Sequence, residues 1–525
     1  MREPTALGQL IGRLTGWRRY LVATLMGLVA VAAFPPYGIV PALIPAFALL
    51  IWLARSATSK RGAFAVGLAF GVGHFYGGLY WIAHAFAVYG GPSAIVGWPA
   101  VGGLSVFLAL YPGLVTLLYY KLAAREGSIG LADAALFAAL WTLAEWLRGW
   151  VFTGFPWNPV GSVWVVSDSM LQVTSLVGVY GLGFLTVLVA TAFAGEWWQG
   201  YAEKPKGWWR LPAVAVAVLL LVWGGGAYRL ADAPMNDNQP DVRLRLVQPN
   251  IEQRLKWHPD FRARHVQDQV DISLQPTGEL DGGPTHVIWS ETAVPFYVNG
   301  DEALLSTLAR AVPAGGYLLT GGLRREGSGR DTDRFNSLLV IDNVGRIAAD
   351  YDKVHLVPFG EYMPLGDYLP FDKLTPGRAD FAKGEAFTPI AVPGLPPFQP
   401  LICYEAIFPA DVVSPTAPRP DWLLNITNDA WYGLSIGPYQ HFGLVRIRAV
   451  EEGLPVVRVA NTGVSGVIDS WGRVRTSLDL GQRGFIDAAL PKPIEPTAFS
   501  KTGNLPVLIV VLLIVCWRWY ARNQT

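Results

Sequence analysis

Three residues of different chemistry each follow a short apolar stretch, and together they would form an acyl-transfer site. Glu291 ends the stretch 287–291 (VIWSE), Lys353 opens the stretch 353–361 (KVHLVPFGE), and Cys403 ends the stretch 401–403 (LIC). A cysteine thiol can attack a carbonyl, a carboxylate can take its proton, and an ammonium can stabilise the oxyanion. Each residue alone is more typical of a solvated edge, a surface charge or a buried small side chain. Only the combination predicts catalysis.

Cys403 is one of two cysteines in the chain, and the other, Cys516, falls in an apolar C-terminal stretch. Two cysteines exclude a disulfide framework and a four-thiolate zinc site. We expect residues 405–412 to form a short helix. A helix N-terminus and a neighbouring lysine would lower the pKa of Cys403. The sequence has neither the histidine and cysteine spacing of a zinc site nor a phosphate-binding loop, so we expect no metal and no cofactor.

Alternating strands and helices must position these residues in the segment that carries them. Apolar runs rich in Val, Ile and Leu predict nine strands, at 242–249, 285–290, 316–322, 336–342, 398–403, 422–427, 455–461, 464–469 and 484–490. Helical patterns lie near 258–275, 300–312 and 438–452. This order predicts a layered α/β domain with its site at the strand ends. The Pro- and Gly-rich stretch 358–400 and the loop around Trp431 are lid candidates.

The rest of the chain is too apolar for a soluble protein. Charged residues make up 15% of the 525 positions and hydrophobic residues 52%, whereas an ordinary soluble chain carries about 25% charged residues. Only 7 of the 40 Asp and Glu precede residue 231, and the other 33 lie in 231–504 with 25 of the 41 Lys and Arg. The low charge disfavours disorder, and the uneven distribution indicates a membrane part joined to an acidic, water-soluble part.

Eight apolar stretches are candidates to cross a membrane, which takes about 20 helical residues. They lie at about 20–34, 37–54, 62–86, 94–120, 130–148, 170–194, 211–229 and 505–520. With the N-terminus in the cytoplasm, the short loops on that side collect the basic residues, and the opposite loops have almost none. We therefore expect a membrane domain with seven transmembrane helices at 1–230. An outward-facing soluble domain would follow at 231–504, then a last transmembrane helix and a short cytoplasmic tail at 505–525.

The motifs resemble those of one enzyme family. Glu291, Lys353 and Cys403, separated by 62 and 50 residues, resemble the Glu-Lys-Cys triad of the nitrilase superfamily. The stretches 353–361 (KVHLVPFGE), 403–405 (CYE) and 428–431 (NDAW), with 34–36 (FPP) and 145–149 (EWLRG), are similar to those of the apolipoprotein N-acyltransferases, the membrane branch of that superfamily. The arrangement of eight spans, with the large domain before the last one, also resembles this family.

The resemblance implies a fold, a reaction and a set of site residues. The fold would be a polytopic α-helical membrane domain of about eight spans plus an α/β nitrilase-like αββα sandwich at 231–504. The acyl donor would be a phospholipid, typically phosphatidylethanolamine. The acceptor would be the α-amino group of the N-terminal diacylglyceryl-cysteine of an apolipoprotein. The route would be ping-pong through a thioester on Cys403, with Glu291 as base and Lys353 as oxyanion stabiliser. Glu361, Tyr404 and Glu405 would support the site, and Trp431 would shape the acyl pocket.

The resemblance also implies a location and a form. The chain would be a multi-pass protein of the bacterial inner membrane with its catalytic domain in the periplasm. It would work as a monomer without a nucleic-acid partner.

Two other readings of the sequence remain open. The first is a membrane-tethered hydrolase or amidase that uses the same triad with water as acceptor, although one anchor would suffice for tethering. The second is a transporter or receptor with an outer sensory domain, which predicts polar residues along several spans. Few such residues occur in the apolar stretches.

Overall fold

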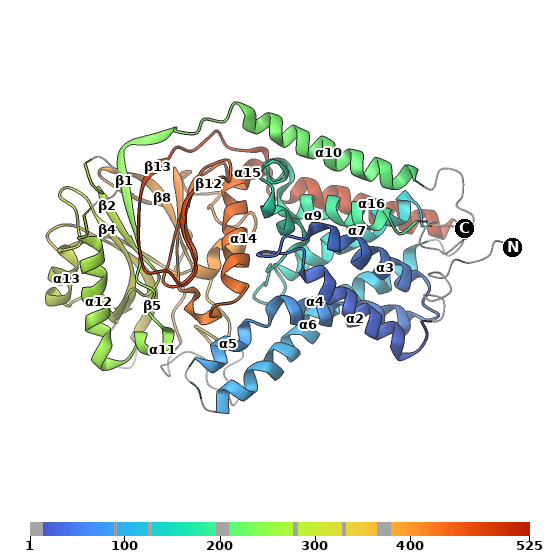
Figure 1. The fold of residues 1–525 in the computed structure, drawn as a ribbon, viewed down its shortest axis with the longest axis horizontal. Coiled ribbons are helices and arrows are strands. Elements are labelled where there is room, and N and C mark those ends of the chain that lie inside the picture. The colour runs from blue at the N-terminus through green and yellow to red at the C-terminus, as the bar shows by residue number, and fades with distance from the viewer. Residues whose placement is uncertain are drawn as a thin grey trace. The chain divides into compact units, whose positions relative to one another are not determined.

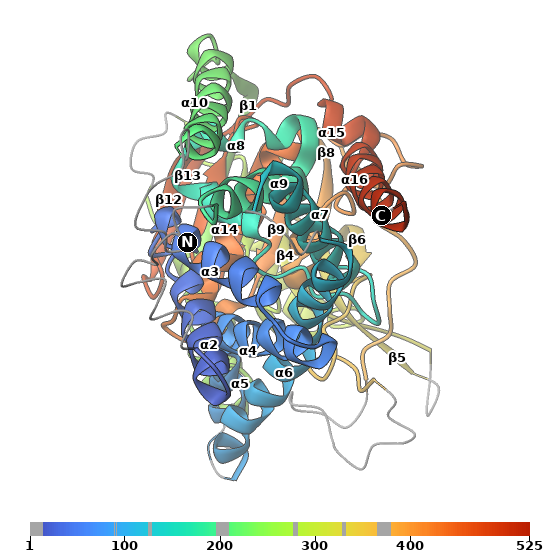
Figure 2. The same cartoon turned by 90° about the vertical axis from the view of Figure 1, so that its right-hand side faces the viewer.

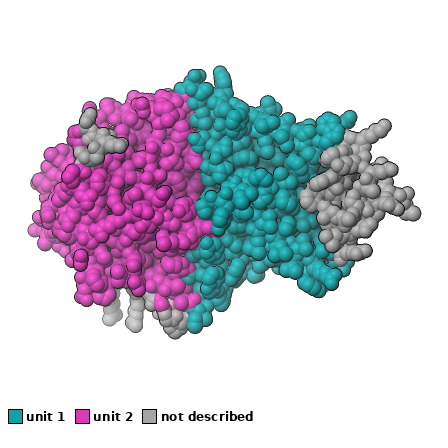
Figure 3. Space-filling model, in the orientation of Figure 1, with its two compact units in different colours: residues 1–83, 95–232, 498–525 teal, residues 84–94, 233–497 magenta. Residues whose placement is uncertain are grey.

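A computed structural model of the chain describes residues 14–88, 90, 92–123, 129–195, 209–276, 282–327, 332–364 and 380–524. These residues form two compact units, coloured separately in Figure 3. Unit 1 comprises residues 1–83, 95–232 and 498–525, and unit 2 comprises residues 84–94 and 233–497. Residues 365–379 of the lid candidate 358–400 lie outside the described residues.

Unit 2 contains two sheets (Figure 1). The first has the order β13-β1-β2-β4-β5-β6, with β3 beside β4, and the second has the order β12-β11-β10-β9-β8-β7. The strands of the first sheet are β1 (Asn238–Gln248), β2 (His286–Trp289), β3 (Val294–Tyr297), β4 (Leu318–Glu326), β5 (Asp333–Ile341), β6 (Ile347–Asp352) and β13 (Gly484–Pro491). Those of the second are β7 (Ile390–Val392), β8 (Leu395–Ile402), β9 (Trp422–Thr427), β10 (Val456–Ala460), β11 (Ser465–Ile468) and β12 (Val474–Leu478).

Helices cover the outer face of each sheet (Figure 1). They are α12 (Pro259–Ser273) and α13 (Glu302–Ala309) on the first sheet and α14 (Gly437–Glu452) on the second. The short helices α11 (Gln253–Lys256), η3 (Cys403–Ile407) and η4 (Asp429–Tyr432) follow the strands β1, β8 and β9 in the chain. One buried core joins α12 and α13 to the first sheet, and another joins α14 to the second. A third core lies between the sheets and takes residues from both.

The strands alternate their side chains between these cores as a pleated strand requires. In β9, Leu424 packs between the sheets, whereas Leu423 packs toward α14. In β2, Ile288 packs between the sheets and Trp289 toward α12. The expected αββα sandwich is therefore confirmed.

All nine predicted strands and all three predicted helices are present, with ends shifted by a few residues. Four strands escaped prediction: β3 and β7 are very short, and β6 and β12 are partly exposed edge strands with polar residues. The helix expected at 405–412 is wrong, because η3 ends at Ile407 and Phe408 is already extended. Phe408 precedes Pro409, and a residue before proline is disfavoured in the helical conformation.

Unit 1 is helical, and each of the eight apolar stretches contains a helix. The long helices are α2 (Trp17–Val31), α3 (Leu43–Arg55), α4 (Lys60–Leu79), α6 (Pro92–Leu122), α7 (Leu131–Arg148), α9 (Thr174–Ala192), α10 (Arg210–Ala231) and α16 (Leu505–Asn523). Shorter pieces are η1 (Val40–Ala42), η2 (Val160–Val166), α8 (Asp168–Leu171) and α15 (Ala498–Thr502). The short helix α5 (Ile82–Ala87) begins with residues of unit 1 and ends with residues of unit 2. Five helices, α4, α6 from Ala94, α9, α10 and α16, are long and apolar enough to cross a membrane. The count of eight spans stays a prediction.

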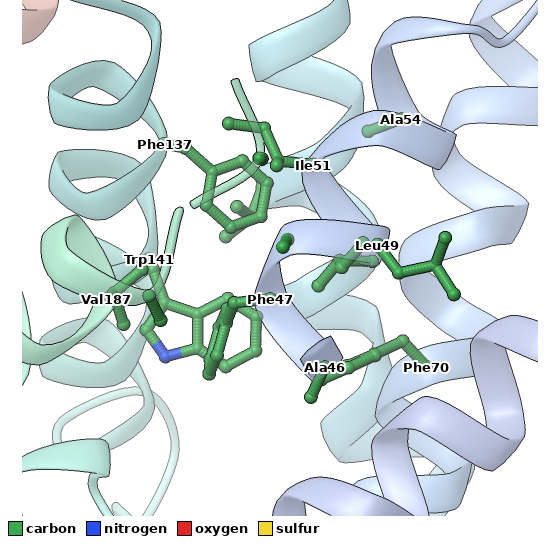
Figure 4. Packing of buried hydrophobic residues seen from close by; sticks show 14 of the residues in the cluster. Ala46, Phe47, Leu49, Ile51, Ala54, Phe70, Phe137, Trp141 and Val187 are labelled. Atoms are coloured by element: carbon green, nitrogen blue, oxygen red, sulfur yellow. The ribbon is translucent and has the colours of Figure 1, made fainter. Parts of the chain in front are cut away.

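The helix α3 lies at the centre of unit 1, with α2, α4 and α9 packed against it (Figure 2). Most of its residues are buried, as expected for a helix that is apolar on all sides. The Phe47 ring meets the Trp141 ring edge-on at 4.7 Å between centroids, and the Phe70 ring meets the same indole at 5.9 Å (Figure 4). This aromatic cluster ties α3, α4 and α7 together.

The helices α2 and α4 approach so closely that two glycines are required at their contact. A methyl group on Gly27 would lie 2.0 Å from the carbonyl oxygen of Phe70, and one on Gly73 would lie 2.0 Å from that of Thr24. Small residues at a helix crossing allow such backbone approach in membrane bundles. The two glycines therefore set the distance between α2 and α4.

Gly27→Ala should lower the stability of the full-length protein in detergent. The methyl group must displace a backbone carbonyl, and such overpacking costs about 1–3 kcal/mol. Gly103→Ala in α6 is the matched control, because a methyl group there meets nothing within 4 Å. Thermal unfolding should show a lower midpoint for Gly27→Ala only. Equal midpoints for the two variants would contradict the close contact.

Candidate active site

The ammonium of Lys353 lies between two carboxylates in the interior of unit 2. Its Nζ is 2.8 Å from Oε2 of Glu361 and 3.5 Å from Oε1 of Glu291. The amide of Asn336 donates to both carboxylates, at 2.9 Å to Glu291 and 2.8 Å to Glu361. All four side chains are buried. Burial alone would lower the pKa of Lys353, but the charges of Glu361 and Glu291 raise it above its ordinary value.

The first sheet brings Glu291 and Lys353 together. Glu291 lies in the turn after β2, and Lys353 directly follows β6. The main-chain N–H of Lys353 donates to the carbonyl of Asn336 in β5, at 2.9 Å. The turn after β2 passes so close to β4 that a Cβ on Gly321 would lie 2.4 Å from the main-chain nitrogen of Thr292. Glycine at 321 is therefore what allows Glu291 to reach the site.

Cys403 comes from the second sheet, at the end of β8. It opens η3 with φ = 55°, a left-handed conformation that is uncommon for a residue with a side chain. Its carbonyl is held at 3.2 Å by Nε2 of His441 and at 3.4 Å by the amide of Asn425. Its Sγ lies 3.9 Å from the hydroxyl of Tyr432. Backbone strain that surrounding contacts maintain is typical of catalytic residues.

The thiol of Cys403 is protonated at rest, contrary to the expectation from the sequence. Burial and the charge of Glu291 raise the pKa of Cys403 to about 12, and the charge of Lys353 opposes them only in part. The expected lowering rested on a helix at 405–412, and the five-residue 3-10 helix η3 takes its place. A thiol in this state needs a base to take its proton before it can attack.

Glu405 joins the segment that carries Lys353 to the segment that carries Cys403. Its Oε1 accepts hydrogen bonds from the Tyr351 hydroxyl at 3.0 Å, from the Val354 N–H at 2.7 Å and from the His355 N–H at 3.0 Å. Its Oε2 accepts from the Ile402 N–H at 2.6 Å. Burial raises the pKa of Glu405 to about 7, although these hydrogen bonds and Lys353 lower it. One buried carboxylate thus links both sheets beside the site.

The other two expected supporting residues are Tyr404 and Trp431. Tyr404 follows it directly, and the Tyr404 ring packs against Phe408 and His355 at 5.1 and 5.6 Å between centroids. Trp431 lies in η4, next to Tyr432, and is half-buried. The role of Trp431 in an acyl pocket therefore stays a prediction.

Four polar groups at the site were not predicted from the sequence. They are the side chains of Asn336, His441 and Lys256 and the main-chain N–H of Asn428, which donates to Oε2 of Glu291 at 2.9 Å. The sequence offers one signal for Asn336, because a polar amide stands in the apolar strand predicted at 336–342. His441 is held by Asp429 at 3.0 Å, and Arg458 lies 2.6 Å from the same carboxylate. Burial would raise the pKa of Asp429, but Arg458 and His441 lower it to about 2.

The arrangement suits nucleophilic attack on a carbonyl. Glu291 is a carboxylate held by three donors, Lys353 is a buried cation, and Cys403 is a protonated thiol between strand and turn. Proton transfer from Cys403 to Glu291 would generate the nucleophile, and Lys353 would stabilise the oxyanion. Within the described ranges no group of three or more His, Cys, Asp or Glu side chains is arranged to hold a metal ion.

Comparison with protein families gives two matches that together cover most of the chain. Residues 26–192 match the apolipoprotein N-acyltransferase N-terminal domain, and residues 276–498 match the carbon-nitrogen hydrolase family.

Curated relatives match over nearly their whole length. The apolipoprotein N-acyltransferase of Rhodopseudomonas palustris is 38% identical over 516 residues, which cover 95% of this chain and 94% of that protein. The apolipoprotein N-acyltransferase of Bradyrhizobium diazoefficiens is 39% identical over 521 residues, which cover 95% of this chain and 94% of that protein. Among solved structures, the protein XC1258 from Xanthomonas campestris, a CN-hydrolase superfamily protein, is 22% identical. The match covers 52% of this chain and 97% of the XC1258 chain, with a TM-score of 0.35.

Glu405→Gln should destabilise the protein more than Tyr351→Phe does. All four partners of the carboxylate are donors, so an amide leaves at least one buried main-chain N–H without an acceptor, which costs about 1–3 kcal/mol. Tyr351→Phe removes one donor only and should cost about 0.5–1.5 kcal/mol. Denaturant unfolding of the two variants gives both values. An equal loss would show that the carboxylate does not join the two segments.

Proposed function

Since the chain belongs to the apolipoprotein N-acyltransferase family, we propose that Cys403 carries the acyl chain as a thioester, with Glu291 as base and Lys353 as oxyanion stabiliser. The protein is a membrane-bound acyltransferase of lipoprotein maturation. It transfers an acyl chain from a phospholipid to the α-amino group of the N-terminal diacylglyceryl-cysteine of a lipoprotein. The observation that carries the site assignment is the buried cluster of Lys353 with Glu291 and Glu361 beside the strained thiol.

In the first half-reaction, Glu291 takes the proton of the Cys403 thiol as the sulfur attacks the ester carbonyl of the phospholipid. The carbonyl oxygen gains negative charge, which the Lys353 ammonium stabilises. The C–O bond then breaks, and the leaving alcohol of the lysophospholipid receives the proton from Glu291. The raised pKa of Cys403 supports this order, because the proton must leave as the carbon–sulfur bond forms.

In the second half-reaction, the α-amino group of the lipoprotein attacks the thioester carbonyl. Glu291 takes a proton from the amine, the carbon–sulfur bond breaks, and the thiolate of Cys403 is protonated again by Glu291. The donor ester supplies the free energy through the thioester, so the reaction balances without a cofactor. Glu361, Tyr404 and Glu405 are the proposed supporting residues, and Trp431 is proposed to shape the acyl pocket.

The helical unit is consistent with lipid substrates. Burying one methylene group is worth about 0.8 kcal/mol, so pulling a whole acyl chain into water would cost many times that amount. An enzyme held in the membrane avoids this cost because the chain stays in an apolar environment. Five helices of unit 1 are long and apolar enough to provide such a hold.

We also propose the finer assignments that the sequence predicts. Phosphatidylethanolamine is the donor, and the enzyme is a monomer, which light scattering of the detergent-solubilised protein would test. The membrane part comprises 1–230 with seven spans, followed by a periplasmic catalytic domain at 231–504 and a last span and tail at 505–525. The protein lies in the bacterial inner membrane.

Cys403→Ala should abolish the reaction. Without the sulfur no thioester forms, so neither lysophospholipid release nor transfer to a lipoprotein amine should occur. The assay uses the full-length enzyme with acyl-labelled phosphatidylethanolamine, and peptide mapping locates the acyl chain on the wild type. Equal release from phosphatidylglycerol would overturn the assigned headgroup. Free fatty acid without a trapped acyl-enzyme and without transfer would favour a hydrolase instead.

Two further variants serve as controls for that assay. Cys516→Ala should leave the activity unchanged, because this exposed cysteine belongs to the apolar helix α16. Glu291→Gln keeps the shape of the side chain but cannot take the thiol proton, so it should form no thioester. An active Cys403→Ala enzyme or a normal thioester yield in Glu291→Gln would contradict the assigned roles.

The proposed orientation is tested by a matched pair of cysteine variants. Thr416 is exposed in unit 2 and Thr58 is exposed between α3 and α4, so either position can carry a labelled cysteine in a Cys516→Ala background. A membrane-impermeant maleimide should label Thr416→Cys in intact spheroplasts, but should label Thr58→Cys only after permeabilisation. The reverse pattern would place the catalytic domain in the cytoplasm.

A further inference from the structure

A second lysine lies buried beside the base of the site. Lys256 ends the short helix α11 and is 2% exposed. Its ammonium donates to the main-chain carbonyl of Glu291, at 3.0 Å. No carboxylate among the described residues lies within ion-pair distance of it. A buried ammonium without an ion-pair partner is costly, so stability alone does not explain a lysine at this place.

Contacts with Asn428 and Glu291 hold the helix α11, which carries Lys256. The side chain of Gln253, in the same helix, accepts from the Asn428 amide at 2.7 Å. The main-chain N–H of Asn428 donates to the carboxylate of Glu291 at 2.9 Å. A closed set of contacts therefore runs from Lys256 through Glu291 and Asn428 back to α11.

The charges around Glu291, the proposed base, do not balance without a second cation. Glu291 and Glu361 surround a single ammonium, Lys353, so this group of three carries a net negative charge. Lys256 brings that charge back to balance. When the proton of the Cys403 thiol moves to Glu291, the negative charge moves to the sulfur, which also attracts Lys256.

The charge of Lys256 is lost within the range in which an enzyme works. Burial lowers the pKa of Lys256 to about 8, and the charge of Glu291 opposes this lowering. Among the described residues, His265 in α12 is also coupled to Lys256, whose positive charge disfavours the protonated form of that imidazole. A change from ammonium to neutral amine would remove the attraction for both Glu291 and the sulfur.

We propose that Lys256 is a positioning residue of the acyl-transfer site, whose protonated ammonium fixes the main chain of Glu291 and balances the charge that reaches Cys403 during thioester formation. This inference rests on the thioester route of the proposed function. Lys256 acts through Glu291 and through its charge, whereas Lys353 stabilises the oxyanion. It follows that thioester formation requires Lys256 in its charged form.

The test is the rate of thioester formation by the full-length enzyme as a function of pH, with acyl-labelled phosphatidylethanolamine and no acceptor. The wild-type rate should fall as the pH rises through about 8, because Lys256 then loses its proton. Lys256→Arg keeps a charge at every pH and should lose this fall. Lys256→Met should be slower by about tenfold or more below pH 8, as expected for the loss of a nearby charge, and should also lose the fall.

Lys492→Met is the control, because Lys492 is a half-exposed lysine paired with Asp237 and should keep the wild-type pH profile. If Lys256 had only a structural role, both Lys256 variants would keep the fall in the rate of thioester formation near pH 8. That result would overturn the inference. A wild-type rate that is constant between pH 7 and 9 would also overturn it, even if Lys256→Met does not fold. Absence of any wild-type thioester would instead overturn the proposed function, and this inference with it.

Discussion

The buried ammonium of Lys353 is the interaction on which the site depends. A charge removed from water is destabilising unless it is paired and hydrogen-bonded, and here two carboxylates and one shared amide provide that pairing. The turn after β2, the strand β5 and the chain after β6 must therefore meet at one point. The first sheet is the frame that makes them meet, and it holds the carboxylate of Glu291, the proposed base, at that point.

The proposed nucleophile, Cys403, comes from the other sheet, so the two sheets must be held in register at their common end. An apolar core between the sheets holds them together but does not fix individual atoms. Glu405 fixes the relative position of the two sheets more closely. One of its oxygens accepts hydrogen bonds from the main chain just after Lys353, and the other accepts one from the residue before Cys403. Directional hydrogen bonds to this buried carboxylate thus align the two segments more closely than packing alone would.

The sequence was sufficient for most of the αββα unit, because the inner strands are apolar and bounded by turn residues. It also named Glu291, Lys353 and Cys403, whose catalytic roles stay predictions. It failed at β6 and β12, where partly exposed edge strands carry polar side chains. It also failed for the pKa of Cys403, because burial and the position of Glu291 are properties of the tertiary structure. Lys256 gave no signal at all, since nothing in the sequence around α11 distinguishes a buried lysine from a surface one.

The raised pKa of Cys403 has a consequence for the compartment in which the enzyme is proposed to act. The thiolate is the form that reacts with disulfides and oxidants, so a buried thiol kept protonated is protected on an oxidising face of the membrane. Protection and catalysis are compatible only if the base lies within the same site and is used when substrate is present. The carboxylate of Glu291, held beside the Lys353 ammonium, is the proposed base that meets that condition without a permanently reactive sulfur.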